Sequence, residues 1–220
     1  MPKVGVVLSG CGVNDGAEIH ESVITMLALD RAGAEYQCMA PDVEQMHVVN
    51  HLTGEVAEGE SRNVLVESAR IARGEIVDLA GVTSNDMDAL IFPGGFGAAK
   101  NLCDFAVKGA DCHVHSEVLR VVKEMHKAGK PIGVICISPA MMAKVMEDSG
   151  STIDLTIGTD EETAGAIESM GASHVSCSVE EFVVDHENKI VSTPAYMSAN
   201  RITEVEAGIT KLVDEVLKLI

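Results

Sequence analysis

The residue of this sequence with the clearest capacity for chemistry is Cys136. In Gly133–Ala140 a β-branched apolar run ends at this cysteine, Ser138 can then cap a helix, and Pro139 suits the first helical turn. Such a strand-to-helix turn points a side chain out of the carboxyl edge of a parallel sheet, where α/β proteins bind ligands. The helix N-terminus would favour a thiolate. Cys136 is therefore either a nucleophile or a small core residue, and this segment leaves both interpretations open.

Two acidic residues follow the first predicted strand and could act with this cysteine. Glu18 and Glu21 are three residues apart, so a helix carries them on one face. We expect Glu18 to complement the helix dipole. Glu21 directly follows the loop after the first strand, and this loop opens at the same sheet edge as Cys136. Its carboxyl group could there tune the nucleophilicity of the sulfur or carry its proton.

Two glycine-rich loops could bring backbone N–H groups to a ligand. Pro93–Gly97, which includes Gly94 and Gly95, is either a plain turn or an oxyanion-binding loop. The earlier loop from Gly10 to Gly16 has GxGxxxG rather than GxGxxG spacing, and acidic neighbours there would repel a phosphate. We therefore expect no dinucleotide cofactor.

The remaining polar residues give weaker signals. No histidine is assigned a catalytic role: His20 should point away from Glu21, and the His113/His115 pair predicts no metal site. Cys11, in the loop after the first strand, could face the same sheet edge as Cys136 and even form a disulfide with it.

Strand and helix patterns that alternate along the chain must position these residues. The alternation predicts an α/β fold, with a mostly parallel sheet and helices on both faces, in a single domain over residues 1–220. The expected strands are Val4–Leu8, Tyr36–Met39, Ala89–Phe92, Ile132–Ile135 and a hairpin of Phe182–Val184 with Lys189–Val191. The expected helices include Ser61–Arg73, Val114–Ala128, Ala140–Met146 and Ser198–Leu219, and a first helix carries Ile19, Val23, Ile24 and Leu27 at helical spacing.

Composition restricts the partners. The net charge of −18 over 220 residues argues against binding to nucleic acid or to an anionic membrane surface. No apolar run is long enough to span a bilayer. Six scattered cysteines, without metal-type spacing and without a leader segment, predict reduced thiols and a cytoplasmic protein.

Three loops, each following a predicted strand, carry Glu21, Gly94-Gly95 and Cys136. Their residues resemble the deglycase/PfpI superfamily, relatives of the class I glutamine amidotransferases. Gly16–Ile24 resembles its first-helix motif, Phe92–Gly95 its oxyanion turn, and Ile135–Pro139 its nucleophile elbow. Within that superfamily the chain resembles the ElbB group of bacterial "enhancing lycopene biosynthesis" proteins, also described as glyoxalases. The motifs that carry this second resemblance are Leu8–Gly12, Asn50–Glu55, Gly94–Leu102 and Thr193–Met197.

The resemblance implies a flavodoxin-like three-layer sandwich, a homodimer and no cofactor. It implies a nucleophile at Cys136, a neighbouring carboxyl group at Glu21, and backbone donors in the Gly94-Gly95 turn and at Ile137. Asn50, in a polar insertion, is a possible neighbour of the site. That insertion is a plain loop, a cover for the site or a dimer contact.

The sequence also departs from the family pattern. Amidotransferases carry a His-x-Glu motif on a late strand, and this chain has none; Leu155–Thr159 stands where related deglycases supply a histidine. Glutaminase activity is therefore not expected. The resemblance favours a slow glyoxalase that converts glyoxal, a small aldehyde, to glycolate. The alternative is a non-catalytic redox-sensing or partner-binding module, for which an accessory role in isoprenoid biosynthesis is one option.

Overall fold

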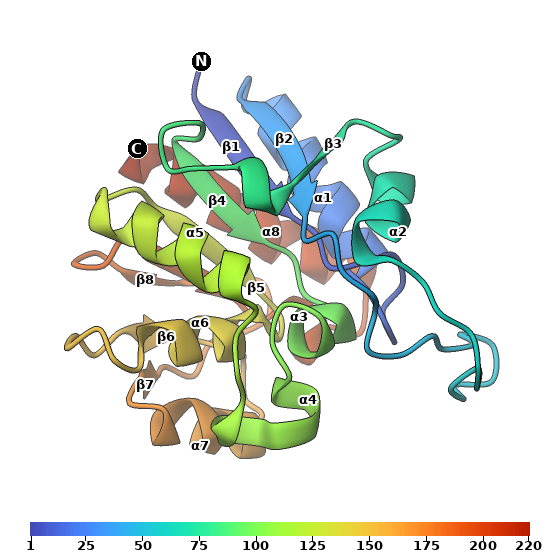
Figure 1. The fold of residues 1–220 in the computed structure, drawn as a ribbon. Coiled ribbons are helices and arrows are strands. Elements are labelled where there is room, and N and C mark those ends of the chain that lie inside the picture. The colour runs from blue at the N-terminus through green and yellow to red at the C-terminus, as the bar shows by residue number, and fades with distance from the viewer.

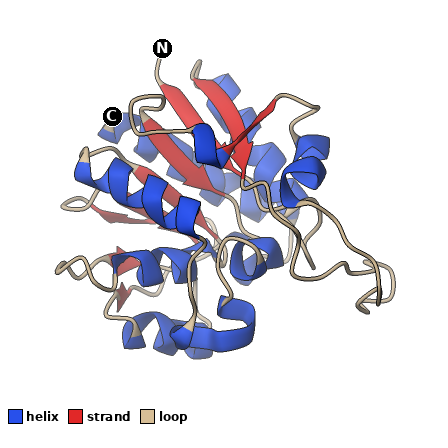
Figure 2. Cartoon of the chain, viewed as in Figure 1, coloured by secondary structure: helices blue, strands red, loops and turns tan.

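The computed structural model describes residues 1–220 and shows a seven-stranded sheet between two layers of helices (Figures 1 and 2). The strand order is β3-β2-β1-β4-β5-β9-β8, and all neighbours are parallel except β8 and β9. The predicted α/β sandwich with a mostly parallel sheet is confirmed. The strands of the sheet are β1 (Lys3–Val7), β2 (Glu35–Ala40), β3 (Ile76–Asp78), β4 (Ala89–Phe92), β5 (Ile132–Ile135), β8 (Val183–Asp185) and β9 (Ile190–Thr193).

Each face of the sheet has its own apolar core. Val4 and Val6 of β1 are buried on one side and Val7 on the other, as alternation along a strand requires. The first core lies under α1 (Ile19–Arg31), α2 (Val64–Ile71) and α8 (Ile202–Leu219); the second lies under α5 (Ser116–Lys127) and α6 (Ser138–Met146). The shorter elements are α3 (Phe96–Lys100), α4 (Phe105–Lys108), α7 (Glu161–Ser169), three 3-10 turns (Leu79–Gly81, Gly109–Asp111, Ala195–Met197) and a small separate sheet of β6 (Asp154–Leu155) with β7 (Ser173–His174).

Of the four apolar side chains that its spacing singled out, the first helix buries only Ile24. Ile19, Val23 and Leu27 are 40–46% exposed, whereas the polar residues Glu21, Ser22 and Thr25 are among those facing the interior. The hydroxyl groups can be buried there because each donates to a main-chain carbonyl one turn earlier, Ser22 to Glu18 and Thr25 to Glu21. Hydrophobic spacing therefore identified the helix but not its buried face.

Most helices begin later than the sequence pattern indicates, because polar caps set their starts. Asn63 accepts a hydrogen bond from the Val66 N–H at 3.0 Å, so α2 begins at Val64. Glu204 accepts from the N–H groups of Asn200 and Arg201, so α8 begins at Ile202. None of the helices combines the length and the apolar composition needed to cross a bilayer.

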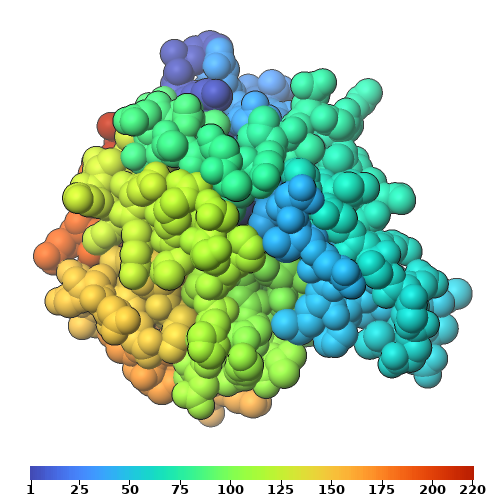
Figure 3. Space-filling model, in the orientation of Figure 1, coloured from blue at the N-terminus to red at the C-terminus, as the bar shows by residue number.

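The insertion after β2 forms an arm that projects from the body of the molecule (Figures 1 and 3). The arm is fastened to the loop after β1: the Val49 N–H donates to Asp15 Oδ2 at 2.7 Å, and the Asn14 N–H donates to His51 Nε2 at 3.1 Å. In the turn that follows Val49, Asn50 Oδ1 accepts from the Leu52 N–H, and the Leu52 side chain is 95% exposed.

Packing at β5 generates a prediction about stability. A Cβ atom on Gly133 would lie 2.9 Å from Leu212 Cδ2 of α8. We expect Gly133→Ala to lower the free energy of unfolding by about 1–3 kcal/mol through overpacking, and Leu212→Ala by about 2–5 kcal/mol through a cavity. The double variant should lose less than the sum, because the new methyl group enters the space that Leu212 vacates. Urea unfolding of the four proteins measures this coupling, and strictly additive losses would contradict the packing.

Candidate active site

Cys136 stands at a strained elbow between β5 and α6. Its φ angle is +61°, a left-handed conformation that is costly for a residue with a side chain. The Cys136 N–H donates to Thr193 O of the neighbouring strand at 3.0 Å, which holds the elbow at the carboxyl edge of the sheet. The thiol is 7% exposed. The sequence correctly placed this residue at a strand-to-helix turn.

The expected role of Ser138 is wrong. Ile137 precedes the first residue of α6 and no side chain caps the helix; Ser138 already lies in the first turn, together with Pro139. The Ser138 hydroxyl instead donates to Pro93 O at 2.9 Å, so it ties the elbow to the glycine turn after β4.

Glu21 is completely buried beside this cysteine. Its Oε2 accepts the Gly94 N–H at 2.8 Å and its Oε1 accepts the Tyr196 N–H at 3.3 Å, while the carboxyl group also hydrogen-bonds to Cys136. Glu18 caps the same helix, because its Oε2 accepts the Glu21 N–H at 2.7 Å. The expected pairing of Glu21 with Cys136 is present, and Glu18 serves the helix terminus as expected.

The close contact between the two groups depends on a glycine. A Cβ atom on Gly94 would lie 2.5 Å from Cys136 Cβ and 2.7 Å from Glu21 Oε2. Because the Gly94 N–H is taken by Glu21, it is not free to stabilise an oxyanion, contrary to expectation. The N–H groups of Gly95 and Ile137 do point to the sulfur of Cys136, as expected of backbone donors.

Burial dominates the protonation of this pair. Desolvation, reinforced by the charge of Glu18, raises the pKa of Glu21 to about 8, although three hydrogen bonds oppose the rise. Burial and the carboxylate of Glu21 raise the pKa of the Cys136 thiol well above its usual value, against the N–H groups of Gly95 and Ile137. The helix N-terminus therefore does not produce the resting thiolate expected from the sequence; at neutral pH the pair holds its protons.

A cavity of about 740 Å³ opens onto the sulfur. Apolar side chains such as Phe96 and Phe105 make up most of its wall, and its charged residues are all acidic: Glu18, Asp160 and Glu162. No lysine, arginine or histidine lines it. It therefore suits a small uncharged molecule better than an anion.

The structure separates two expected neighbours from the site. Cys11 and Asn50 do not line the cavity. The charges that act on Cys11 come mainly from Glu67 and Arg70 of α2, and both Cys11 and Cys136 are free thiols. Asn50 is exposed, and its side chain accepts the Leu52 N–H of its own turn. No group of three or more His, Cys, Asp or Glu side chains is arranged to hold a metal ion.

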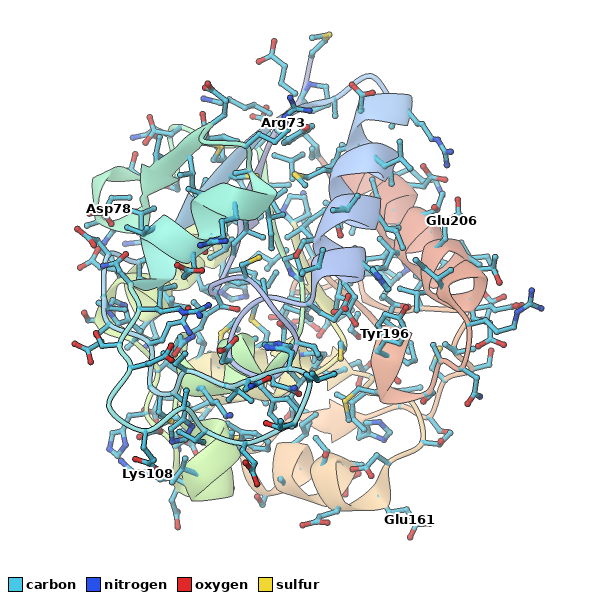
Figure 4. All side chains as sticks on the ribbon, turned by 90° about the vertical axis from the view of Figure 1, so that its right-hand side faces the viewer. Arg73, Asp78, Lys108, Glu161, Tyr196 and Glu206 are labelled. Atoms are coloured by element: carbon cyan, nitrogen blue, oxygen red, sulfur yellow. The ribbon has the colours of Figure 1, made fainter.

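Sequence reasoning missed Tyr196 and His20. Tyr196 lines the cavity, and its hydroxyl lies 2.7 Å from Nδ1 of His20, which is exposed and points away from the buried Glu21 as expected. Figure 4 shows Tyr196 close to the start of α1. The Thr193–Met197 motif was the available signal, because it follows a strand that neighbours β5 in the sheet.

Several known proteins are similar to this chain in sequence, in fold or in both. Residues 11–193 match the model of the DJ-1/PfpI family. The chain is 52% identical to human "Glutamine amidotransferase-like class 1 domain-containing protein 3, mitochondrial", over 99% of this chain and 83% of that protein. A crystal structure of an isoprenoid biosynthesis protein with an amidotransferase-like domain from Ehrlichia chaffeensis superposes with a TM-score of 0.92 and 38% identity, over 99% of this chain and 100% of that one. Drosophila melanogaster DJ-1beta, with a TM-score of 0.57 and 19% identity over 100% and 96% of the two chains, shares the fold.

The buried carboxyl group generates a prediction about pH. The folded protein keeps the Glu21 proton up to about pH 8, whereas an unfolded chain releases it near the ordinary value of 4.5. This contribution to stability is full below pH 4.5 and is lost as the pH rises to 8, by about 1.4 kcal/mol for each pH unit within that window. Glu21→Gln should lose less stability between pH 5 and pH 8 than the wild type. Urea unfolding measures the difference, Glu187→Gln at an exposed site is the control, and parallel curves for wild type and Glu21→Gln would refute the prediction.

Proposed function

Because the chain belongs to the DJ-1/PfpI family, we propose that it is a glyoxalase-type enzyme that converts glyoxal to glycolate without a cofactor. The observation that carries the proposal is the buried Glu21–Cys136 pair at the wall of an apolar cavity, with the N–H groups of Gly95 and Ile137 directed at the sulfur. Glyoxalases and deglycases occur in this family. Within it, we assign the chain to the ElbB group on the four motifs described above.

The first step joins the substrate to Cys136. Glu21, in its carboxylate form, takes the thiol proton as the sulfur attacks one aldehyde carbon of glyoxal. The C=O π bond breaks, and the new oxyanion lies toward the N–H groups of Gly95 and Ile137. Glu21 then returns the proton to this oxygen and gives a neutral hemithioacetal. Because the Glu21 pKa is about 8, the active form of the pair becomes more abundant as the pH rises towards that value.

The second step is an internal oxidation and reduction that needs no external oxidant. The Glu21 carboxylate removes the hydrogen of the sulfur-bearing carbon as a proton, the electron pair forms an enediol, and the second carbon is then protonated. The first carbon is oxidised to a thioester and the second is reduced to an alcohol. Water cleaves the thioester, which releases glycolate and regenerates the thiol. Atoms balance as glyoxal plus water to glycolic acid.

The cavity supports this substrate class and argues against glutaminase chemistry. Its acidic lining would repel carboxylates and phosphates, whereas glyoxal is small and uncharged. A glutaminase of the amidotransferase type needs a histidine beside its cysteine, and no histidine lines this cavity.

A non-catalytic redox sensor is the alternative function. That hypothesis needs an exposed thiol with a lowered pKa, whereas burial and the Glu21 carboxylate raise the pKa of Cys136. The link to isoprenoid biosynthesis draws support from the name of the Ehrlichia protein alone. For location, we keep the proposal of a reducing compartment such as the cytoplasm, which suits six free thiols, although the human relative is named mitochondrial.

The proposed reaction predicts the behaviour of three variants. Cys136→Ala should abolish glycolate formation from glyoxal, since no bond to the substrate can form. Glu21→Gln should slow it by about 10²-fold or more, since proton transfer loses its base. Cys177→Ala, which alters a cysteine outside the cavity, should keep the wild-type rate. Chromatographic assay of glycolate measures all three, and equal rates for wild type and Cys136→Ala would overturn the proposal.

We also propose that the chain forms a homodimer, through the arm whose exposed Leu52 offers an apolar contact to a second copy. Sedimentation velocity should then give a mass near twice 23.2 kDa. Leu52→Asp should shift the protein towards monomer, whereas Glu55→Gln on the same arm should not. A wild-type monomer at all concentrations would contradict the dimer, and a Leu52→Asp dimer would contradict the role of the arm.

A further inference from the structure

The Glu21–Cys136 pair leaves one proton transfer of the proposed reaction without a donor. Glu21 is 0% exposed and Cys136 7%, so neither exchanges protons freely with water. While the Glu21 carboxylate removes a proton from one carbon, the oxygen on the other carbon must receive one. No histidine lines the cavity, and no lysine or arginine does either. The group that supplies this proton must therefore come from elsewhere in the wall.

Tyr196 is the only tyrosine of the cavity wall, and its hydroxyl group is linked to a second ionisable side chain. Its hydroxyl lies 2.7 Å from Nδ1 of His20, and the two rings are tilted by 47° with centroids 5.8 Å apart. Its backbone N–H donates to Glu21 Oε1 at 3.3 Å. Adjacent residues of α1 therefore hold both ends of Tyr196, and His20 is exposed to solvent.

Topology explains why Tyr196 meets the nucleophile. It lies in the turn Ala195–Met197 directly after β9, and β9 pairs with β5 in the register Ile135↔Thr193. The carboxyl ends of these two strands are neighbours, so both Cys136 and Tyr196 leave the sheet at the same edge. Burial, together with the charges of Glu18 and Glu21, raises the pKa of Tyr196, which keeps the phenol in its proton-donating form.

We propose that Tyr196 is the general acid of this site and that His20 is a positioning residue that orients its hydroxyl group through the 2.7 Å contact. The inference rests on the proposed glyoxalase function. As Glu21 removes the proton from the sulfur-bearing carbon, Tyr196 donates its hydroxyl proton to the oxygen of the second carbon, and an enediol forms. Glu21 then protonates the second carbon, and the hydroxyl of the first carbon returns a proton to the Tyr196 phenolate. The products are the thioester and the neutral phenol, so the step balances without any added reactant.

The same contacts would arise if Tyr196 only fastened its turn to α1, so the test must separate the two roles. Tyr196→Phe keeps the ring and the backbone N–H to Glu21 but removes the hydroxyl. We expect it to lower kcat for glyoxal by about 10²-fold with KM nearly unchanged. The rate at which iodoacetamide alkylates Cys136 should stay at the wild-type level, because the Glu21–Cys136 pair is intact.

His20→Ala provides the second measurement. It should lower kcat by about tenfold, and added imidazole should restore most of the loss, because the vacated position is open to solvent. A residue that merely fastens the turn would not be rescued by a free base. Tyr36→Phe at an exposed position of β2 and His186→Ala in the β8–β9 turn are matched controls and should behave as wild type.

The outcomes separate this inference from the proposed function. If Cys136→Ala is inactive but Tyr196→Phe keeps the wild-type kcat, the glyoxalase stands and Tyr196 is not its acid. If Tyr196→Phe slows Cys136 alkylation in parallel with kcat, the general acid is refuted in favour of a structural role for Tyr196. If imidazole fails to rescue His20→Ala, the positioning role of His20 is refuted. If wild type and Cys136→Ala are equally active or equally inactive, both proposals fail.

Discussion

A carboxyl group buried without a cation beside it is the constraint on which the rest of this structure depends. Glu21 is completely enclosed, and its hydrogen-bond partners are the backbone N–H groups of Gly94 and Tyr196 and the thiol of Cys136. An ionised carboxylate in such surroundings is costly, so the group keeps its proton up to a pKa of about 8. The three loops that meet there are held in place because each supplies a partner to this one side chain.

The backbone conformation at Gly94 and Cys136 follows from the close packing of these three loops around Glu21. Gly94 has no side chain because the space above it is already filled by Cys136 and Glu21. Cys136 takes a left-handed φ of +61°, which costs about 1–3 kcal/mol for such a residue. Hydrogen bonds on both sides of the elbow, from Cys136 to Thr193 and from Ser138 to Pro93, offset this strain. The stability of the sheet thus maintains a conformation that places the sulfur at the cavity wall.

The electrostatics of the cavity complete this arrangement. A wall that is apolar and acidic, without cationic side chains, offers little help to an anion and no permanent stabilisation of a thiolate. Any negative charge on Cys136 or on a bound oxygen must therefore be stabilised by backbone N–H groups and relieved by proton transfer. Glu21 and Tyr196 both lie at this site, and the segments that carry them contact each other through the Tyr196 N–H and Glu21 Oε1.

The sequence by itself determined the fold class, the strand-to-helix elbow at Cys136 and the approach of Glu21, because strand ends and loop composition are local features that topology brings to one sheet edge. It could not determine which face of α1 is buried, since that face combines apolar residues with hydroxyl groups that are satisfied within the helix. It also gave the wrong protonation state for the Cys136 thiol. Burial raises the pKa of this thiol, and the extent of burial is set by the tertiary packing around the sulfur. Tertiary structure alone decided that the Gly94 N–H serves Glu21, that Cys11 and Asn50 lie outside the cavity, and that Tyr196 meets His20. Those outcomes are set by distances between segments up to 176 residues apart, and no local pattern encodes them.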